Sequence, residues 1–338
     1  MERKILATNE TLVLENGIKL HNLNITYHSA GKLNNNKSNV IWICHALTAN
    51  SDINNWWENS VGKGKVFDTN KYFVICANIL GSTYGTTGPL SIDPETNEPY
   101  YHSFPEITIN DIVKAHQILK THLQINKIEL LIGGSIGGFQ ALQWTITEPL
   151  LINKLCLIAT SYQATPWSIA FNETQRMTIR ADQTWTENRQ DAGRLGLKAA
   201  RAIALLSYRN YNAYNTTQQG YNENNIHKAI SYQNYQGNKL LLRFNAFSYF
   251  CLLNAFDSHN IAKKQQKAED ILKTIIAKTA IIGINSDMLF PNTEQQFLAN
   301  NIKNSSFEII SSDFGHDGFL IETDKIFPIV NKLLEHEQ

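Results

Sequence analysis

The chain has 338 residues, with 30 lysines and arginines against 30 aspartates and glutamates, so its formal net charge is zero. This length suits one large domain or two ordinary ones, and a hydrophobic content of 43% excludes a disordered chain. Zero net charge leaves no electrostatic footprint for nucleic acid or for an anionic membrane surface as a partner. About one residue in nine is asparagine, which we interpret as neutral surface polarity in place of charge.

The start of the chain and its cysteines indicate a cytoplasmic protein. Residues 1–17 hold charge but no apolar run of the kind that a secretory signal needs. No apolar stretch approaches the roughly 18 residues that span a membrane. No two cysteines form a CxxC pair, so we expect buried free thiols in a reducing compartment, with neither a disulfide framework nor a metal site. The four cysteines are Cys44, Cys76, Cys156 and Cys251.

The pattern of apolar residues predicts an α/β fold. Residues 11–27 alternate around Asn16-Gly17, a hairpin signal, so the chain is expected to open with antiparallel strands. Later apolar runs are continuous and are interleaved with helical patterns such as 107–125, which is typical of a mostly parallel sheet covered on both faces. These runs span 40–47, 72–80, 128–134, 154–160, 279–285 and 307–310.

The strand pattern stops in the middle of the chain. Residues 162–275 contain helical segments without a clear strand run, separated by a stretch rich in tyrosine, asparagine and glutamine at 208–225. We interpret 162–275 as a helical lid and the polar stretch as a loop of that lid. The catalytic domain would then consist of 1–161 and 276–338, and its last helix, 324–336, is expected to pack back onto the sheet.

The segment Gly133-Gly134-Ser135-Ile136-Gly137 fits the pattern G-x-S-x-G between a strand and a helix. A serine on such a tight turn presents its hydroxyl at the edge of the sheet, where the start of the helix faces developing negative charge. Gly133 and Gly137 relieve the crowding that a Cβ would cause there. The alternative is a glycine-rich turn with an incidental serine. We predict that Ser135 is a nucleophile.

A nucleophilic serine needs a base, and the base needs an orienting carboxylate. Asp287 directly follows the apolar run at 279–285, and His316 follows the last run, so both are predicted to complete a triad with Ser135. His45 also follows a strand but precedes the serine, where an oxyanion loop is expected. Asp313 is a rival to Asp287, although only three residues separate it from His316.

Two backbone N–H groups are candidates for an oxyanion hole. The first is that of Ile136, which directly follows the nucleophile, and the second is that of Leu47, in the segment 44–52 that follows the apolar residues 40–43. Because the donor is a backbone N–H, the identity of the Leu47 and Ile136 side chains is weak evidence for or against an oxyanion hole.

Taken together, these segments resemble the homoserine O-acyltransferase family of the α/β-hydrolase fold, nearly from end to end of the chain. GTTGP at 85–89 and GHDGFL at 315–320 are more specific together than the serine turn alone. The residue after the nucleophile, usually Met in this family, is Ile136 here, and Thr83 stands where the family often has Cys. The matching segments span 44–52, 56–96, 104–125, 133–144, 235–250, 285–291 and 315–320.

This resemblance implies transfer of an acetyl group from acetyl-CoA to the hydroxyl of L-homoserine, a step towards methionine, through an acyl-serine in a ping-pong cycle. Acetyl-CoA would be a co-substrate, and no bound cofactor is expected. The resemblance also implies a homodimer joined through the helical insertion.

Recognition of the substrate by Arg201, Tyr208 and Asp317 is also implied by the resemblance. Arg201 and Tyr208 would hold the homoserine end of the substrate, with the guanidinium on its carboxylate, and Asp317 would meet its amino group. Independently, Arg201 and Tyr208 share one helical stripe with Leu197 and Leu205, and an arginine in an apolar stripe must be paired or must reach solvent. The alternatives are an internal salt bridge for Arg201 and a core role for Tyr208.

Three rival functions stay open at this point. The first is a different reaction of the same family, in which serine replaces homoserine as acceptor or succinyl-CoA replaces acetyl-CoA as donor. A plain esterase would release acyl groups into water without any amino acid. A binding protein on the same fold would have no catalytic activity, and the complete set of Ser135, Asp287 and His316 argues against it.

Overall fold

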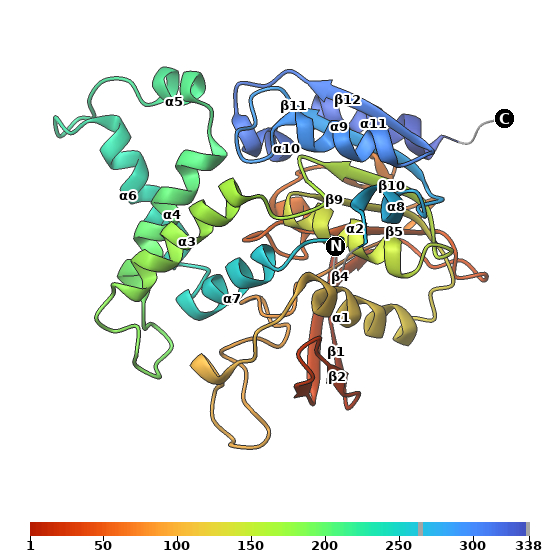
Figure 1. Cartoon of the computed structure of the whole chain (residues 1–338), viewed down its shortest axis with the longest axis horizontal. Coiled ribbons are helices and arrows are strands. Elements are labelled where there is room, and N and C mark those ends of the chain that lie inside the picture. The colour runs from red at the N-terminus through yellow and green to blue at the C-terminus, as the bar shows by residue number, and fades with distance from the viewer. Residues whose placement is uncertain (263–265, 336–338) are drawn as a thin grey trace.

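The structure, a computed structural model, describes residues 1–262 and 266–335. Its centre is an eight-stranded sheet with the order β1-β4-β8-β5-β9-β10-β11-β12 (Figure 1). The pairs β1/β4 and β4/β8 are antiparallel, and all later neighbours are parallel. These strands are β1 (Glu2–Thr8), β4 (Leu23–Ala30), β5 (Val40–Cys44), β8 (Phe73–Ala77), β9 (Ile128–Gly134), β10 (Ile152–Ile158), β11 (Lys278–Ile284) and β12 (Ser305–Ile310).

Each of the six apolar runs overlaps one strand of this sheet, so the predicted α/β class is confirmed. The hairpin signal is confirmed too, because β2 (Leu12–Val13) pairs antiparallel with β3 (Lys19–Leu20) and Gly17 has a left-handed φ of 87° in the turn. A further small sheet joins β6 (Val61–Gly62) to β7 (Phe67–Asp68).

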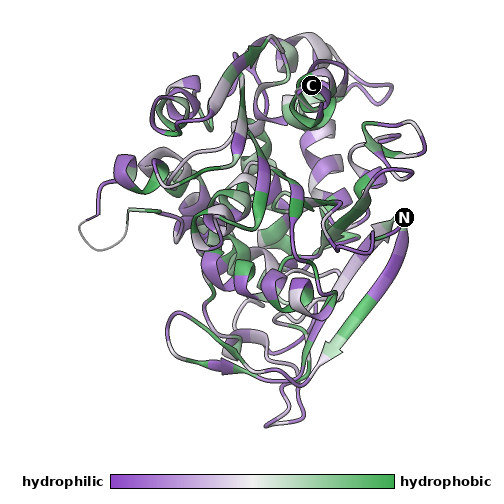
Figure 2. Ribbon diagram, turned by 90° about the vertical axis from the view of Figure 1, so that its right-hand side faces the viewer, coloured by the Kyte–Doolittle hydropathy of each residue, from purple (hydrophilic) through white to green (hydrophobic). Residues whose placement is uncertain are grey.

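The two faces of the sheet bury separate apolar layers. Along β5, the side chain of Trp42 packs in one layer, and those of Ile41 and Ile43 pack in the other. All three are fully buried, which explains why this strand reads as a continuous apolar run. In Figure 2 the hydrophobic residues gather at the centre of the molecule.

Helices cover both layers. The first layer contains buried side chains of α1 (Ile109–His122), α2 (Ile136–Thr147) and α9 (Asn292–Asn301), and the second contains those of α11 (Thr323–Leu334). The start of α1 is fixed by a capping box, in which the Thr108 side chain accepts from the Asp111 N–H and Asp111 accepts from the Thr108 N–H.

The described part of 162–275 contains helices and isolated bridges but no strand. Figure 1 shows α3 to α6 standing beside the carboxyl ends of the parallel strands. One helix of the range, α8, packs against α9, which lies outside the range expected for the lid. The helices of this range are α3 (Pro166–Arg180), α4 (Arg194–Tyr208), α5 (Tyr211–Thr217), α6 (Lys228–Leu241), α7 (Ala246–Asp257) and α8 (Ala268–Leu272).

The expectation that 208–225 is a loop is wrong in part, because α5 lies within it. The Asn210 side chain accepts a hydrogen bond from the Asn212 N–H and so caps this helix. Polar residues that suggest a loop by composition therefore also supply the cap of a short helix.

The last helix, α11, packs on β10 and β11, as expected for 324–336. Residue 336 of that expectation lies outside the described residues. Within the described residues, none of the helices has the length and apolar character needed to cross a membrane.

Candidate active site

Ser135 occupies a strained turn between β9 and α2. Its φ of 58° and ψ of −129° lie in a region that side chains rarely adopt, at a typical cost of about 1–3 kcal/mol. The turn is tight because a Cβ on Gly133 would lie 2.2 Å from Gly137 O, and one on Gly137 would lie 2.2 Å from Cys44 O. The two glycines therefore make the close approach possible.

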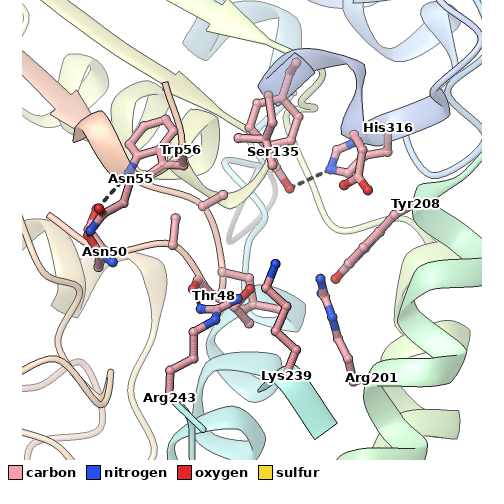
Figure 3. A pocket seen from close by; sticks show the side chains of 16 residues that line it. Thr48, Asn50, Asn55, Trp56, Ser135, Arg201, Tyr208, Lys239, Arg243 and His316 are labelled. Carbon is pink, nitrogen blue, oxygen red and sulfur yellow. Dashed lines mark hydrogen bonds between the residues drawn. The ribbon is translucent and has the colours of Figure 1, made fainter. Parts of the chain in front are cut away.

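The three residues of the predicted triad are in contact. His316 Nε2 lies 2.9 Å from Ser135 Oγ (Figure 3), and on the other side of the ring His316 Nδ1 lies 2.7 Å from Asp287 Oδ2. Asp287 Oδ1 accepts from the N–H groups of Leu289 and Phe290, which keeps the carboxylate in position. This is the geometry of a serine nucleophile with an oriented base.

The structure also shows the positions of Asp313 and His45, the alternatives considered for the carboxylate and the base. Asp313 is exposed and makes no hydrogen bond to His316, so Asp287 is the carboxylate that contacts the base. His45 is fully buried, with Nδ1 2.8 Å from Ala46 O and Nε2 accepting from the Ile79 N–H at 3.0 Å. Burial lowers the pKa of His45 to about 4, so its ring is neutral at neutral pH.

Ser286, which the sequence did not single out, joins the loops that carry the acid and the base. Its hydroxyl donates to Ser312 O and accepts from the Gly315 N–H. Gly315 has a φ of 63°, and a Cβ there would lie 2.8 Å from Tyr208 O at the end of α4. The turn that holds His316 is therefore packed directly against the lid.

The two candidate oxyanion donors flank the serine. Leu47 lines the same cavity as Ser135, and Ile136 is the first residue of α2. Within the described part of the chain, no hydrogen-bond acceptor is found for the N–H of either residue. Neither N–H is therefore committed to another group among these residues.

A cavity of about 460 Å³ opens above Ser135 between the sheet edge and the lid. Arg201 and Lys239 point into it from the lid, opposite Ser135 and His316 (Figure 3). Arg243 also lines it and donates hydrogen bonds to Thr48 O and to the Tyr84 hydroxyl.

The predicted recognition residues lie together on one side of this cavity. The Arg201 guanidinium lies 5.7 Å from the centre of the Tyr208 ring, which in turn lies 5.7 Å from the His316 ring. Asp317 forms an ion pair with Arg209 Nε at 3.0 Å, a partner that the sequence did not identify. Among the described residues, no carboxylate pairs with Arg201, so the internal salt bridge considered for it is absent there.

Burial sets the protonation of two of these groups. It raises the pKa of Tyr208 to about 12, against the opposing effect of Arg201, so the phenol stays neutral. Burial also raises the pKa of Asp317, while the guanidinium groups of Arg209 and Arg201 act in the opposite direction.

Lys239, Arg243 and Arg209 were not predicted as site residues. Each lies at or near the cavity because a lid segment folds over the sheet edge. Lys239 and Arg243 lie in the segment 235–250, which resembles the family, but no local sequence pattern predicted that they lie opposite the serine. In the described residues, no group of three or more histidine, cysteine or acidic side chains is arranged to hold a metal ion.

The fold and the triad define the chain as a member of the α/β-hydrolase class, and the alpha/beta hydrolase fold family matches residues 39–323. A homoserine O-acetyltransferase from Bacillus anthracis has a TM-score of 0.90 and 24% identity, covering 99% of this chain and 98% of its own. Esterase E22 has a TM-score of 0.89 and 23% identity, covering 99% and 100%. At such identities these two structures establish the fold alone.

Sequence similarity is more specific. The chain is 41% identical over 327 residues to the homoserine O-acetyltransferase of Cyclobacterium marinum, covering 96% of this chain and 93% of the relative. The homoserine O-acetyltransferase of Chlorobium chlorochromatii is 40% identical, covering 97% and 94%. The chain belongs to the homoserine O-acetyltransferase family and is an enzyme of that type.

Replacement of the serine tests the triad. Ser135→Ala removes the hydroxyl that contacts His316, so we expect acylation by p-nitrophenyl acetate, followed by mass spectrometry, to fall by more than about 10³-fold. Ser60→Ala is a matched control, because Ser60 is also buried and its hydroxyl donates to Trp57 O instead. Acylation of Ser135→Ala at the rate of the unmodified chain would refute the assignment.

The buried histidines predict acid sensitivity of the fold. Burial lowers the pKa values of His45 and His116 to about 4, whereas unfolded histidine titrates near about 6.5. The unfolded chain therefore binds more protons between these values, and the free energy of unfolding falls as pH decreases from about 6.5 to about 4.

His116→Gln provides the measurement, since it keeps a donor towards Gln140 but cannot titrate. In chemical denaturation at several pH values, we expect a slope shallower by up to about 1.4 kcal/mol per pH unit. Equal slopes in both proteins would contradict the prediction.

Proposed function

We propose that the chain transfers an acetyl group from acetyl-CoA to the hydroxyl of L-homoserine by a ping-pong mechanism through acyl-Ser135. The observation that carries this proposal is a hydrogen-bonded Ser135–His316–Asp287 triad in a cavity that also holds Arg201 and Asp317. The names of the relatives point to the same acceptor and acyl group.

In the first half-reaction, Ser135 Oγ attacks the carbonyl carbon of the thioester while His316 Nε2 takes its proton. The Leu47 and Ile136 N–H groups stabilise the resulting oxyanion. As the tetrahedral intermediate collapses, the carbon–sulfur bond breaks and His316 returns the proton to the thiolate, releasing CoA. Asp287 holds the ring of His316 in the required tautomer throughout.

In the second half-reaction, His316 takes the proton of the homoserine hydroxyl, and the homoserine oxygen attacks the carbonyl carbon of the acyl-enzyme. The bond between Ser135 Oγ and the acyl carbon then breaks, and His316 returns the proton to the serine. Water competes at this step, and the lid helices over the cavity favour transfer by limiting its access.

Charge supports an amino acid as acceptor. Arg201 has no carboxylate partner among the described residues, and its fork suits the bidentate binding of a carboxylate. Asp317, which forms an ion pair with Arg209, suits the ammonium group. Tyr208 lies between Arg201 and His316, so the bound amino acid would extend along its ring towards the base.

Charge also supports a phosphorylated donor. The cavity is lined by Arg201, Lys239 and Arg243 but by a single acidic residue, Asp317. One guanidinium suffices for a substrate carboxylate, so Lys239 and Arg243 exceed what homoserine needs. Phosphate groups of CoA are suitable partners for them.

Two of the rival functions have support of their own. The distal carboxylate of a succinyl donor would also suit Lys239, and the contact of Ser135 with His316 in an open cavity would equally serve hydrolysis, which is a second candidate function. A serine acceptor has the same charged groups as homoserine and is one methylene shorter.

The cellular setting is part of the proposal. We infer a cytoplasmic enzyme of methionine biosynthesis that forms a homodimer through the lid. Support for the dimer comes from large apolar side chains that the lid exposes, which are Leu195 (74%), Leu206 (53%), Ile230 (52%) and Leu242 (83%).

Thiol release in four combinations tests the function: acetyl-CoA or succinyl-CoA as donor, with homoserine or serine as acceptor. We expect acetyl-CoA with homoserine to be fastest, release without an amino acid to be slow, and double-reciprocal plots to be parallel. Ser135→Ala is the control for enzymatic release. Equal release with and without amino acid would instead indicate an esterase, and a faster succinyl or serine reaction would identify one of the family alternatives.

Arg201→Lys tests the recognition of the acceptor, because it keeps the charge but loses the fork. A hydrogen bond to a charged group contributes about 1.5–3 kcal/mol, so KM for homoserine should rise roughly 10- to 150-fold, with little change in KM for acetyl-CoA. Arg194→Lys, in the exposed first turn of the same helix and outside the cavity, is the matched control. An unchanged KM for homoserine in Arg201→Lys would exclude the assigned role.

A further inference from the structure

The imidazole of His45 holds the peptide unit that carries the Leu47 N–H. Ala46 O and the Leu47 N–H belong to one trans peptide, in which carbonyl and N–H point in opposite directions. His45 Nδ1 lies 2.8 Å from Ala46 O, and the Ala49 N–H donates to the same oxygen at 3.0 Å. Fixing this carbonyl therefore fixes the direction of the Leu47 N–H.

The tautomer of His45 is fixed as well. Because Nε2 accepts from the Ile79 N–H at 3.0 Å, the proton of the neutral ring lies on Nδ1, where it is donated to Ala46 O. The ring is fully buried, and burial lowers its pKa to about 4, which supports a neutral donor throughout the pH range of an assay.

The second candidate donor is held in the same way. Ser135 O accepts from the Thr160 hydroxyl at 2.9 Å and from the Gly138 N–H at 2.9 Å, so the Ile136 N–H of that peptide points to the opposite side. The buried amide of Gln140 joins the segment that carries Leu47 to the start of α2, since its Nε2 donates to His45 O at 3.2 Å and to Ile136 O at 3.1 Å. In both peptides, the carbonyl that is paired with the candidate N–H is thus held by two hydrogen bonds.

We propose that His45 is a positioning residue for acyl transfer, whose Nδ1–H holds the Ala46–Leu47 peptide so that the Leu47 N–H faces the oxyanion before substrate binds. The inference rests on the proposed function in one respect, namely that Ser135 is acylated. When the Ser135 Oγ–carbon bond forms, the carbonyl electron pair moves to oxygen and the serine proton moves to His316. A peptide that is already oriented stabilises that oxygen without reorganisation.

Two amide variants, each of which places a nitrogen near one nitrogen of the ring, separate this role from simple packing. The amide nitrogen of His45→Asn falls near the position of Nδ1 and keeps a donor for Ala46 O, whereas the amide of His45→Gln falls near Nε2 and loses it. Both variants lose the buried ring, so both should melt at lower temperature than the unmodified chain. We expect kcat to be largely retained in His45→Asn and to fall about 10²–10³-fold in His45→Gln, with KM nearly unchanged.

His259→Gln controls for the loss of a buried imidazole, because His259 is 2% exposed and its ring stacks on Phe139. It should lower the melting temperature without lowering kcat. Equal losses of kcat in the Asn and Gln variants of His45, or no loss in the Gln variant, would overturn the inference.

The rate is measured both as homoserine-dependent CoA release and as acylation of Ser135 by p-nitrophenyl acetate. If the unmodified chain is acylated by the ester but transfers nothing to homoserine, the proposed function fails, while the Asn and Gln comparison still decides the role of His45. Absence of acylation in the unmodified chain would overturn both.

Discussion

The first turn of α2 approaches the end of β5 so closely that no side chain fits between them, as the 2.2 Å separation between a Cβ on Gly137 and Cys44 O demonstrates. This contact has two consequences. Ser135 is driven into left-handed backbone with a φ of 58°, which lifts its hydroxyl off the helix. The loop that follows β5 is placed beside the serine, so that Leu47 shares its cavity.

Parallel strand order brings the remaining groups to the same place. The carboxyl ends of β9, β11 and β12 lie at one edge of the sheet, so residues that follow them meet there even when they are distant in sequence. Ser135 and His316 are separated by 181 positions, yet their side chains lie 2.9 Å apart. The sheet thus supplies the chemistry of the site, which is why one fold serves both transferases and esterases among the structural neighbours.

Local sequence patterns predicted the residues at strand ends but not the contacts made across the lid. Ser135, Asp287 and His316 could be identified because each closely follows an apolar run. The pairing of Arg209 with Asp317 depends on how the end of α4 folds over the histidine turn, a long-range arrangement that no local period encodes. Composition was misleading at Asn210, where asparagine caps α5 instead of marking a loop, because the same side chain favours turns and helix starts.

The neutral total charge of the chain conceals an uneven distribution, and the lid is responsible for it. Arg201, Lys239 and Arg243 all belong to lid segments, and they line the cavity together with one acidic residue from the sheet side. The basic side chains of the cavity therefore come from the helical insertion, whereas the triad comes from the ends of the sheet strands. The backbone of Tyr208 lies against Gly315, next to His316, so a shift of α4 would displace the base as well as Arg201. This contact therefore links the position of Arg201 to that of His316.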